Sequence, residues 1–317
     1  MKYFITGGAG FIGANYVEHL FHSGKTLTKV TVYDNFTYAG NAKNFSKFKS
    51  DPRFNVVVGD ICDLGKLRAA MKDHNYVINF AAESHVDRSI DDSSVFVRTN
   101  VLGTLNVLDC ARKSGIQTVI QISTDEVYGT LSQGSANEDY NLSPNSPYAA
   151  SKASADLLAR SYFVTHGLDV RITRCSNNYG KYQYPEKVIP VFIRKLAQNG
   201  KVPIYGNGRN VREWIHVQDH CRGIQVVLED GSPGEIYNIG SGIHFSNNDL
   251  ASRIIEIMKC SDDSRVYVED RLGHDFRYSV DSCKIAALGF SPIVDLDSGL
   301  EGTIKWYLEN LDWWSEP

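Results

Sequence analysis

A glycine-rich turn directly after the first apolar run constrains the fold of this chain more than any other feature. The run at residues 3–6 is aromatic and β-branched, and the sequence TGGAGFIG at residues 6–13 then opens a segment with helical spacing. Glycine permits a tight turn and a close approach of the backbone to a phosphate, whose charge suits the N-terminus of a helix. The pattern predicts the first strand, turn and helix of a dinucleotide-binding fold.

The same alternation of strand and helix continues through the first half of the chain. Short β-branched runs occur at residues 3–6, 30–33, 56–58, 76–80, 119–122 and 170–173. Helical spacing appears between several of them, which predicts an α/β fold with a doubly wound parallel Rossmann sheet. After residue 174 the rhythm gives way to loops rich in Gly, Asn and Pro. We therefore expect a Rossmann domain over residues 1–175 and a smaller lobe over 176–317, with some later segments, such as residues 214–217, returning to the first domain.

Composition excludes several classes of partner. The chain has 317 residues and a formal net charge of -4, without a long Lys/Arg run, which argues against nucleic acid and against a membrane surface. Its six cysteines are far apart and contain no CxxC pair, so neither a disulfide framework nor a metal site is indicated. The N-terminus enters an apolar strand without a secretory pattern, and no apolar run has the length of a membrane span. We expect a cytoplasmic, soluble protein.

Two aspartates indicate which dinucleotide is bound. Asp34 ends the second predicted strand, about twenty residues after the glycine turn, where a carboxylate accepts both ribose hydroxyls and repels a 2'-phosphate. Asp60 follows the third strand and is placed to meet the adenine. The alternative is that the glycines form ordinary turns and Asp34 is a surface acid. The order of strand, turn, helix and acid, however, agrees in every part with a dinucleotide site. The pattern favours NAD over NADP.

Tyr148 and Lys152 are one helical turn apart in a segment, residues 149–163, that is compatible with a helix. We expect the lysine ammonium to lower the pKa of the phenol, so that Tyr148 removes a proton from a substrate hydroxyl while the adjacent carbon loses a hydride. Thr124, just past the fifth strand, offers a hydroxyl to the same substrate oxygen. In the alternative interpretation, Tyr148 and Lys152 are ordinary residues on a helix surface, and Thr124 only caps a helix or turn.

Asp125 and Glu126 follow at the carboxyl end of the fifth strand, where ligands bind in open α/β sheets. Adjacent carboxylates raise one another's pKa, so one stays protonated as an acid while the other acts as a base. That division suits the loss of water across two neighbouring carbons. The alternative is an acidic pair that favours the start of a helix.

Segments along nearly the whole chain resemble the dTDP-glucose 4,6-dehydratases, which are extended short-chain dehydrogenases/reductases. The matching segments are TGGAGFIG from Thr6, TYAGN from Thr37, GDI from Gly59, AAESHVDRSI from Ala81, STDEVYG from Ser123, NSPYAASKA from Asn145, RCSNNYG from Arg174, PEKVIP from Pro185, YGNGRNVREWIHVQDHCRG from Tyr205 and DRLGHDFRYSVD from Asp270. The related 4-epimerases share the glycine turn and the Tyr/Lys pair but usually lack the Asp-Glu dipeptide. Lys181, Leu272 and Ser241 depart from the usual Pro, Pro and Gly of the family.

The resemblance implies an NAD-binding Rossmann domain and a mainly sugar-nucleotide-binding lobe, together with a reaction and a set of residues. Tyr148 takes the proton of O4 as C4 gives its hydride to NAD, Glu126 removes the C5 proton, Asp125 protonates the departing C6 hydroxyl, and the hydride returns to C6. The implied cofactor-binding residues are Gly7, Gly10, Phe11, Ile12, Gly13, Asp34, Asn35, Asp60, Ile61, Ala81, Ala82, Ser84, Asn100, Ser123, Tyr148, Lys152 and Asn178. The implied substrate-binding residues are Ser84, Thr124, Asn177, Glu186, Lys187, Val188, Pro203, Ile204, Tyr205, Arg212, Asn247, Asp270, Arg271, His274 and Tyr278.

The resemblance also implies a homodimer, formed through a four-helix bundle from the helices near residues 95–110 and 153–163. Two alternatives remain for the function. A 4,6-dehydratase of another nucleotide sugar, such as UDP-glucose, would use the same reacting groups. A nonenzymatic NAD-binding protein would show decay of the catalytic residues, whereas Thr124, Asp125, Glu126, Tyr148 and Lys152 are all intact.

Overall fold

A seven-stranded parallel sheet forms the centre of the molecule. The computed structural model describes residues 1–24, 26–270 and 272–314. In spatial order the strands are β10 (Ile236–Ile239), β6 (Val170–Cys175), β5 (Thr118–Thr124), β4 (Tyr76–Asn79), β1 (Lys2–Thr6), β2 (Lys29–Asp34) and β3 (Phe54–Val58). Every neighbouring pair is parallel, with Ile5 of β1 facing Val32 on one side and Ile78 on the other. The predicted doubly wound sheet is confirmed.

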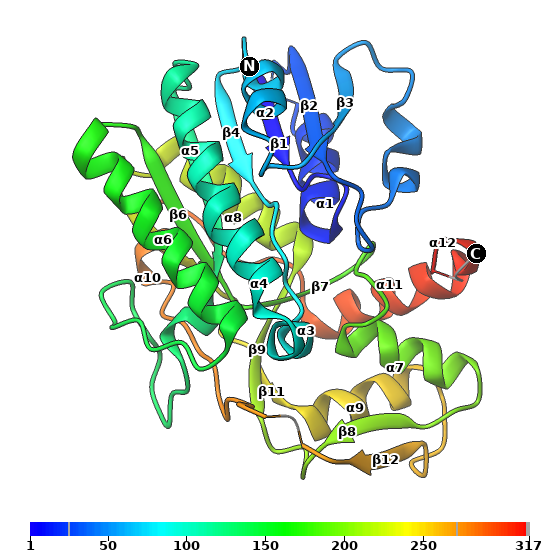
Figure 1. The fold of residues 1–317 in the computed structure, drawn as a ribbon. Helices are drawn as coiled ribbons and strands as arrows, with labels where there is room; N and C mark the ends of the chain where they lie inside the picture. The colour runs from blue at the N-terminus through cyan, green and yellow to red at the C-terminus, as the bar shows by residue number, and fades with distance from the viewer. Residues whose placement is uncertain (25, 271, 315–317) are drawn as a thin grey trace.

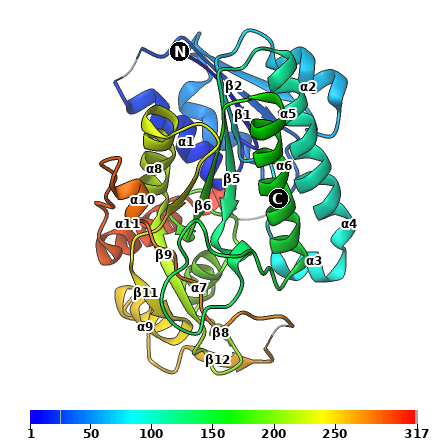
Figure 2. The same cartoon turned by 90° about the vertical axis from the view of Figure 1, so that its left-hand side faces the viewer.

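Helices cover both faces of this sheet, and Figure 2 shows the two layers on either side of it. One face is covered by α1 (Phe11–His22) and α8 (Val217–Asp230), and the other by α2 (Leu64–Met71), α5 (Thr104–Lys113) and α6 (Pro147–His166). Successive residues of β1 point to opposite faces, so Ile5 packs in the first core and Phe4 in the second. Burial on both faces explains why the central strands read as continuous apolar runs.

The sequence pattern suggested one helix near residues 95–110, but the segment is not a single regular helix. It contains α4 (Ser93–Phe96), a π-helical stretch η2 (Val97–Gly103) and then α5. A π turn inserts extra backbone per turn and is frequent beside functional sites. Here it brings Arg98 and Thr99 to the wall of a large cavity.

The second lobe lies below the carboxyl ends of the sheet strands in Figure 1. It contains a three-stranded sheet in the order β11-β9-β7 and a two-stranded sheet of β12 and β8. Its elements are β7 (Asn177–Tyr179), α7 (Val188–Ala197), β8 (Val202–Tyr205), β9 (Val211–His216), β11 (His244–Ser246), α9 (Asn247–Ile257), β12 (Arg265–Val268), α11 (Leu296–Glu309) and α12 (Leu311–Trp314). A separate core holds them together, with Trp214 and Leu300 among its buried side chains.

The chain passes between the two regions more than once. The β10 strand pairs with β6 in the large sheet, and α8 packs against α1 on its face. Residues 214–216 lie in β9, which pairs with β7 and β11, whereas Ile215 and Val217 pack in the core of the large sheet. The division near residue 175 stays a prediction. The remaining short elements are η1 (Ala42–Phe48), α3 (Val86–Asp91), η3 (Asp125–Tyr128) and α10 (Cys283–Ala286).

Among the residues described, the structure holds no helix with the length and hydrophobicity needed to cross a bilayer. Within the same ranges, no group of three or more His, Cys, Asp or Glu side chains is arranged to hold a metal ion. All six cysteines are described and are present as free thiols.

Candidate active site

The glycine-rich turn lies between β1 and α1 and forms one wall of a cavity of about 500 Å³. Gly7 has a φ of +65°, and a Cβ there would come within 2.5 Å of the backbone nitrogen of Ala81, so both the dihedral angle and the close approach require glycine. Gly10 precedes α1 without a side chain to cap it. The N-terminus of α1 therefore meets the cavity as a site suited to a phosphate.

Asp34 ends β2 at the same edge and is almost fully buried. Its Oδ2 accepts a hydrogen bond from the Ala9 N–H at 2.8 Å, and its Oδ1 accepts one from the Phe36 N–H at 2.8 Å. Burial raises the pKa of this carboxyl, while the two backbone N–H groups favour the ionised form. Asp34 thus also fixes the glycine turn, a role that the spacing of the motif did not indicate.

The cavity brings together most of the cofactor-binding residues implied by the sequence. Those that line it are Gly7, Gly10, Phe11, Ile12, Gly13, Asp34, Asn35, Asp60, Ile61, Ala81, Ala82, Ser84, Ser123, Tyr148, Lys152 and Asn178. Asn100 is the exception: it is buried behind the wall, where it bonds both backbone groups of Glu83 and the Ser151 hydroxyl. It therefore positions the loop after β4. This lining suits a dinucleotide, because a helix N-terminus and a strand-end carboxylate face one continuous space.

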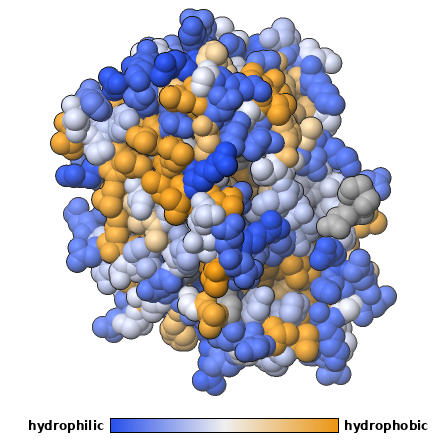
Figure 3. Space-filling view, in the orientation of Figure 1, coloured by the Kyte–Doolittle hydropathy of each residue, from blue (hydrophilic) through white to orange (hydrophobic). Residues whose placement is uncertain are grey.

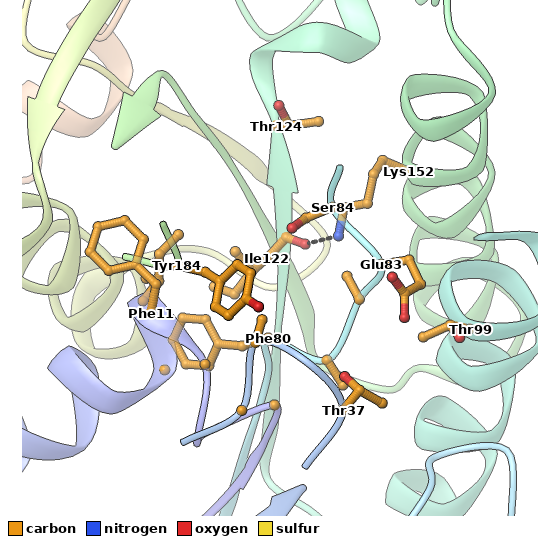
Figure 4. Close-up of a pocket in the computed structure, with 18 of the residues that line it drawn as sticks. Phe11, Thr37, Phe80, Glu83, Ser84, Thr99, Ile122, Thr124, Lys152 and Tyr184 are labelled. Atoms are coloured by element: carbon orange, nitrogen blue, oxygen red, sulfur yellow. Dashed lines mark hydrogen bonds between the residues drawn. The ribbon is translucent and has the colours of Figure 1, made fainter. Parts of the chain in front are cut away.

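Tyr148 and Lys152 share one face of α6, which begins with Ser146 as its N-cap and Pro147 in its first turn. The Lys152 Nζ donates to the carbonyl of Ile122 on β5 at 2.6 Å (Figure 4). Burial raises the pKa of Tyr148 well above its usual range, with the charges of Glu126 adding to the effect, while a hydrogen bond with Thr124 opposes it. Burial therefore sets the direction of this pKa and outweighs the lowering expected from the Lys152 charge.

Thr124, Asp125 and Glu126 turn from the end of β5 into η3. The Thr124 hydroxyl accepts from the Glu126 N–H at 3.3 Å and lies 3.2 Å from Asp125 Oδ1, so Thr124 does cap this short helix. Asp125 is buried, and burial raises its pKa well above the usual range, with the charges of Glu126 and Glu213 adding to the rise. This direction agrees with the prediction that one carboxyl of the pair acts as an acid.

Glu213 was not anticipated from the sequence. It lies on β9, is fully buried, and accepts hydrogen bonds of 2.9 Å from the backbone N–H groups of Gly242 and Val280. The charge of Glu213 opposes the ionisation of Asp125. The signal that could have revealed it is a Glu between Arg212 and Trp214 in a strand that is otherwise buried.

The implied substrate-binding residues divide into two sets. Ser84, Thr124, Asn177, Glu186 and Lys187 line the cavity. The others described lie outside its lining, in the lobe: Val188, Pro203, Ile204, Tyr205, Arg212, Asn247, Asp270, His274 and Tyr278. Arg271 falls outside the described residues.

Arg212 is a lobe residue that links the substrate-binding residues of the lobe to the residues lining the cavity. Its guanidinium donates to the carbonyls of Val211 and Asp275 at 2.8 and 2.9 Å and lies 4.4 Å from the ring centre of Tyr278. Its charge favours the ionised form of Asp125. Burial raises the pKa of Tyr278, and the charge of Glu126 adds to this rise. Arg212 and Tyr278 therefore interact electrostatically with Asp125 and Glu126 although they do not line the cavity.

A polar cluster that the sequence did not predict joins the loop after β2 to the loop before α7. The Arg88 guanidinium lies 3.7 Å from the ring centre of Tyr38 and forms an ion pair of 3.1 Å with Glu186. The Lys187 Nζ donates to the Ser84 carbonyl at 2.8 Å.

Lys181 stands where the family usually has proline. Its Nζ forms an ion pair of 2.7 Å with Glu18, so an ion pair replaces the restraint that proline would supply.

Comparison with known proteins supports the same assignment. The family model described as GDP-mannose 4,6 dehydratase matches residues 4–303. The dTDP-glucose 4,6-dehydratase of Streptomyces griseus is 53% identical over 312 residues, which cover 98% of this chain and 95% of that protein. Among solved structures, DesIV, a dTDP-glucose 4,6-dehydratase from Streptomyces venezuelae with NAD and TYD bound, has a TM-score of 0.97 and 50% identity, covering 99% of both chains.

A second solved structure is the dTDP-glucose 4,6-dehydratase of Bacillus anthracis in complex with NAD, with a TM-score of 0.92, 41% identity, and coverage of 99% of this chain and 98% of that chain. All these similarities extend over nearly the full length and include both the cavity and the lobe. The chain belongs to the GDP-mannose 4,6 dehydratase family, and within it to the dTDP-glucose 4,6-dehydratases.

Proposed function

We propose that this protein converts dTDP-glucose to dTDP-4-keto-6-deoxyglucose, with NAD held in the cavity. The observation that carries the proposal is the pair of the buried Asp125 and the half-buried Glu126 beside Tyr148, because plain dehydrogenation or epimerisation does not need an acid with a raised pKa next to a second carboxylate. The bound NAD supplies a hydride acceptor for C4 and, afterwards, a hydride donor for C6. The Gly7–Gly13 turn and Asp34 would hold its pyrophosphate and ribose.

The residues of the chain then carry the protons. Tyr148 removes the proton from O4, helped by the Thr124 hydroxyl, which favours the phenolate. The resulting ketone at C4 makes the C5 proton acidic, and Glu126 removes it. Asp125, protonated because it is buried beside two other carboxylates, gives its proton to the C6 hydroxyl as it leaves as water.

For the diphosphate, the candidates are Lys187 at the cavity wall and Arg212 in the lobe, since Arg and Lys are the cations that bind phosphate oxygens. The candidates for the remaining contacts are the other substrate-binding residues named from the sequence. A 4,6-dehydratase acting on another nucleotide sugar remains the second candidate, because it would use the same Tyr148, Asp125 and Glu126.

We also propose that two copies associate through α4, η2 and α6. Valine and leucine side chains are exposed along these segments, and Figure 3 shows apolar surface on this side of the molecule. The exposed residues are Val95, Val97, Leu102, Leu157 and Val164. Apolar side chains gathered on neighbouring helices of this kind favour a four-helix bundle between two subunits. The molar mass in solution, measured by light scattering, tests this proposal.

The test of the activity is to incubate the purified protein with dTDP-glucose and, separately, with UDP-glucose, without added NAD. The alkali-induced absorbance of a 4-keto-6-deoxy sugar and the loss of one water by mass report the product. Conversion of dTDP-glucose alone supports the proposal and shows that NAD is retained. Conversion of UDP-glucose instead keeps the mechanism and overturns the nucleotide, whereas no conversion of either, with NAD added, overturns the function.

A further inference from the structure

A third ionisable residue continues the face of α6 that carries Tyr148 and Lys152. Asp156 is one helical turn beyond Lys152, and its carboxylate forms an ion pair with Arg174 of β6, with 3.0 Å between Oδ2 and Nε. The two side chains are only 1% and 3% exposed. Removing both charges from water costs free energy that the ion pair rarely recovers in full, so burial of such a pair is weak support for a role in stability.

The ion pair joins the two halves of the reacting machinery. Arg174 Nη1 donates to the Tyr128 hydroxyl at 2.9 Å, and the guanidinium lies 4.9 Å from the centre of that ring. Tyr128 belongs to η3, the short helix that also carries Asp125 and Glu126. Asp156 and Arg174 therefore connect the helix of the Tyr/Lys pair with the helix of the acidic pair.

Asp156 is also the main anion acting on Lys152. Burial lowers the pKa of the Lys152 amine, and the charges that oppose this effect come first from Asp156 and then from Cys175 of β6. Cys175 is a poor source of negative charge, since burial raises the pKa of its thiol to about 12. Burial raises the pKa of Asp156, and the charge of Arg174 is the main effect that opposes this rise and favours the ionised carboxylate.

The other groups facing this region act on Tyr148. Glu126 and Asp125 of η3 and Cys175 of β6 all oppose the ionisation of its phenol. A phenol in such surroundings needs a nearby positive charge to lose its proton, and Lys152 on the same helix face is the cation that can supply it. The charge on Lys152 therefore matters to the reaction, and Asp156 is what favours it.

We propose that Asp156 is a positioning residue of the reaction, which keeps the Lys152 amine protonated at the edge of the cavity, while Arg174 holds the Asp156 carboxylate in place. The effect on catalysis rests on the proposed function. The ionisation of Lys152, by contrast, is measurable without cofactor or substrate.

The first test follows the titration of Lys152 by NMR in protein containing lysine isotopically labelled at Cε, with the resonance assigned by its absence in Lys152→Met. In Asp156→Asn the midpoint of this titration falls by about one to three pH units, the range expected for the loss of a close opposite charge. Asp169→Asn is the matched control, because Asp169 pairs with Arg171 on β6 at 2.8 Å, away from the cavity lining. An unchanged Lys152 midpoint in Asp156→Asn overturns the proposal.

Asp156→Asn leaves Arg174 buried without its anion, which strongly destabilises a fold. The double variant Asp156→Asn/Arg174→Gln removes that charge as well. Its Lys152 midpoint falls too, but by less than in the single variant, because one positive neighbour has also gone. A double variant that titrates like the original protein contradicts the proposal even if the single variant does not fold.

The second test compares kcat with pH for the same variants. Loss of the Lys152 charge raises the pKa of Tyr148, so the acidic limb of the profile moves to higher pH in Asp156→Asn and stays in place in Asp169→Asn. A uniform drop in kcat with an unmoved limb would assign Asp156 a merely structural role and overturn the proposal. If the original protein converts no nucleotide sugar, the proposed function fails, whereas the NMR titration still decides the role of Asp156.

Discussion

The cofactor end and the sugar end of this site are built differently. At the cofactor end, a contiguous strand, turn and helix place the glycines, and Asp34 ends the adjacent strand, so nearly every residue named from the sequence lines the cavity. At the sugar end, five implied residues line the cavity and the others described lie in the lobe. A site formed by local sequence is predictable from a motif, whereas one formed by distant segments depends on how two regions pack.

The largest effect is expected where the two ends meet. Asp125→Asn removes the proton donor for the departing hydroxyl, and water loss falls by about 10²–10⁴-fold, the usual contribution of a general acid. Because the Asp125 pKa is raised by burial, the acid form persists above the ordinary range of a carboxyl, and activity falls as pH rises through that pKa. Rates of water loss by mass spectrometry over a pH series measure both effects. An Asn variant with undiminished water loss would reassign the acid.

The same raised pKa has a consequence for stability. The folded state holds a proton that the unfolded state releases, so stability is lost as pH rises from the ordinary carboxyl range through the Asp125 pKa. Asp125→Asn cannot ionise and is spared this loss, so its melting temperature exceeds that of the original protein at neutral pH by more than it does in acid. Equal differences at both pH values contradict the burial argument.

A smaller effect is expected at the cofactor end from Asp34→Asn. Asparagine offers one acceptor where the carboxylate offers two, so either the Ala9 or the Phe36 N–H loses its partner. Loss of a hydrogen bond to a charged group costs about 1.5–3 kcal/mol, which corresponds to about 10–100-fold weaker NAD binding. Calorimetry measures the affinity for NAD, and Asp63→Asn, a substitution at an exposed helix cap, is the control. Unchanged affinity would remove Asp34 from the cofactor site.

At the sugar end, Arg212→Lys tests whether a residue outside the cavity lining binds substrate. Lysine keeps the positive charge near Asp125 but lacks the planar fork that donates to several carbonyls and stacks on Tyr278. We expect KM for the nucleotide sugar to rise by about tenfold while NAD affinity is unchanged. Arg209→Lys, at an exposed side chain in the loop just before β9, should leave KM unaltered. A change in NAD affinity instead would break the separation between the two ends.

The smallest effect concerns a distant support of the glycine turn. The Asn44 Nδ2 donates to the Ala9 carbonyl at 3.0 Å, and its Oδ1 accepts from the Trp313 indole N–H of α12 at 2.7 Å. Trp313→Phe keeps an aromatic ring but removes this hydrogen bond, worth about 0.5–1.5 kcal/mol, so NAD affinity falls by about 2–10-fold. Trp306→Phe, which alters the same aromatic cluster, is the control. Equal losses in both variants would attribute the effect to packing.

Several corrections came from packing that no motif records. The shared helix face predicted that Lys152 lowers the pKa of the Tyr148 phenol, but burial outweighs this effect, and the lysine amine donates to the Ile122 carbonyl. Asn100 was implied to bind the cofactor, yet it holds the Glu83 backbone from behind the cavity wall. Each outcome depends on the number of neighbours around a polar group, which sequence spacing does not reveal.

The sequence by itself determined the parallel sheet, the glycine turn, the strand-end position of Asp34 and the shared helix face of Tyr148 and Lys152. All of these follow from periodicity and steric limits over a few residues. Only the tertiary structure decided that Glu213 lies near Asp125, that Arg174 joins Asp156 to η3, and that Arg212 acts from outside the cavity lining. These relations hold between residues far apart in the chain, and their strength depends on burial, because removing water is what makes one charge act strongly on another.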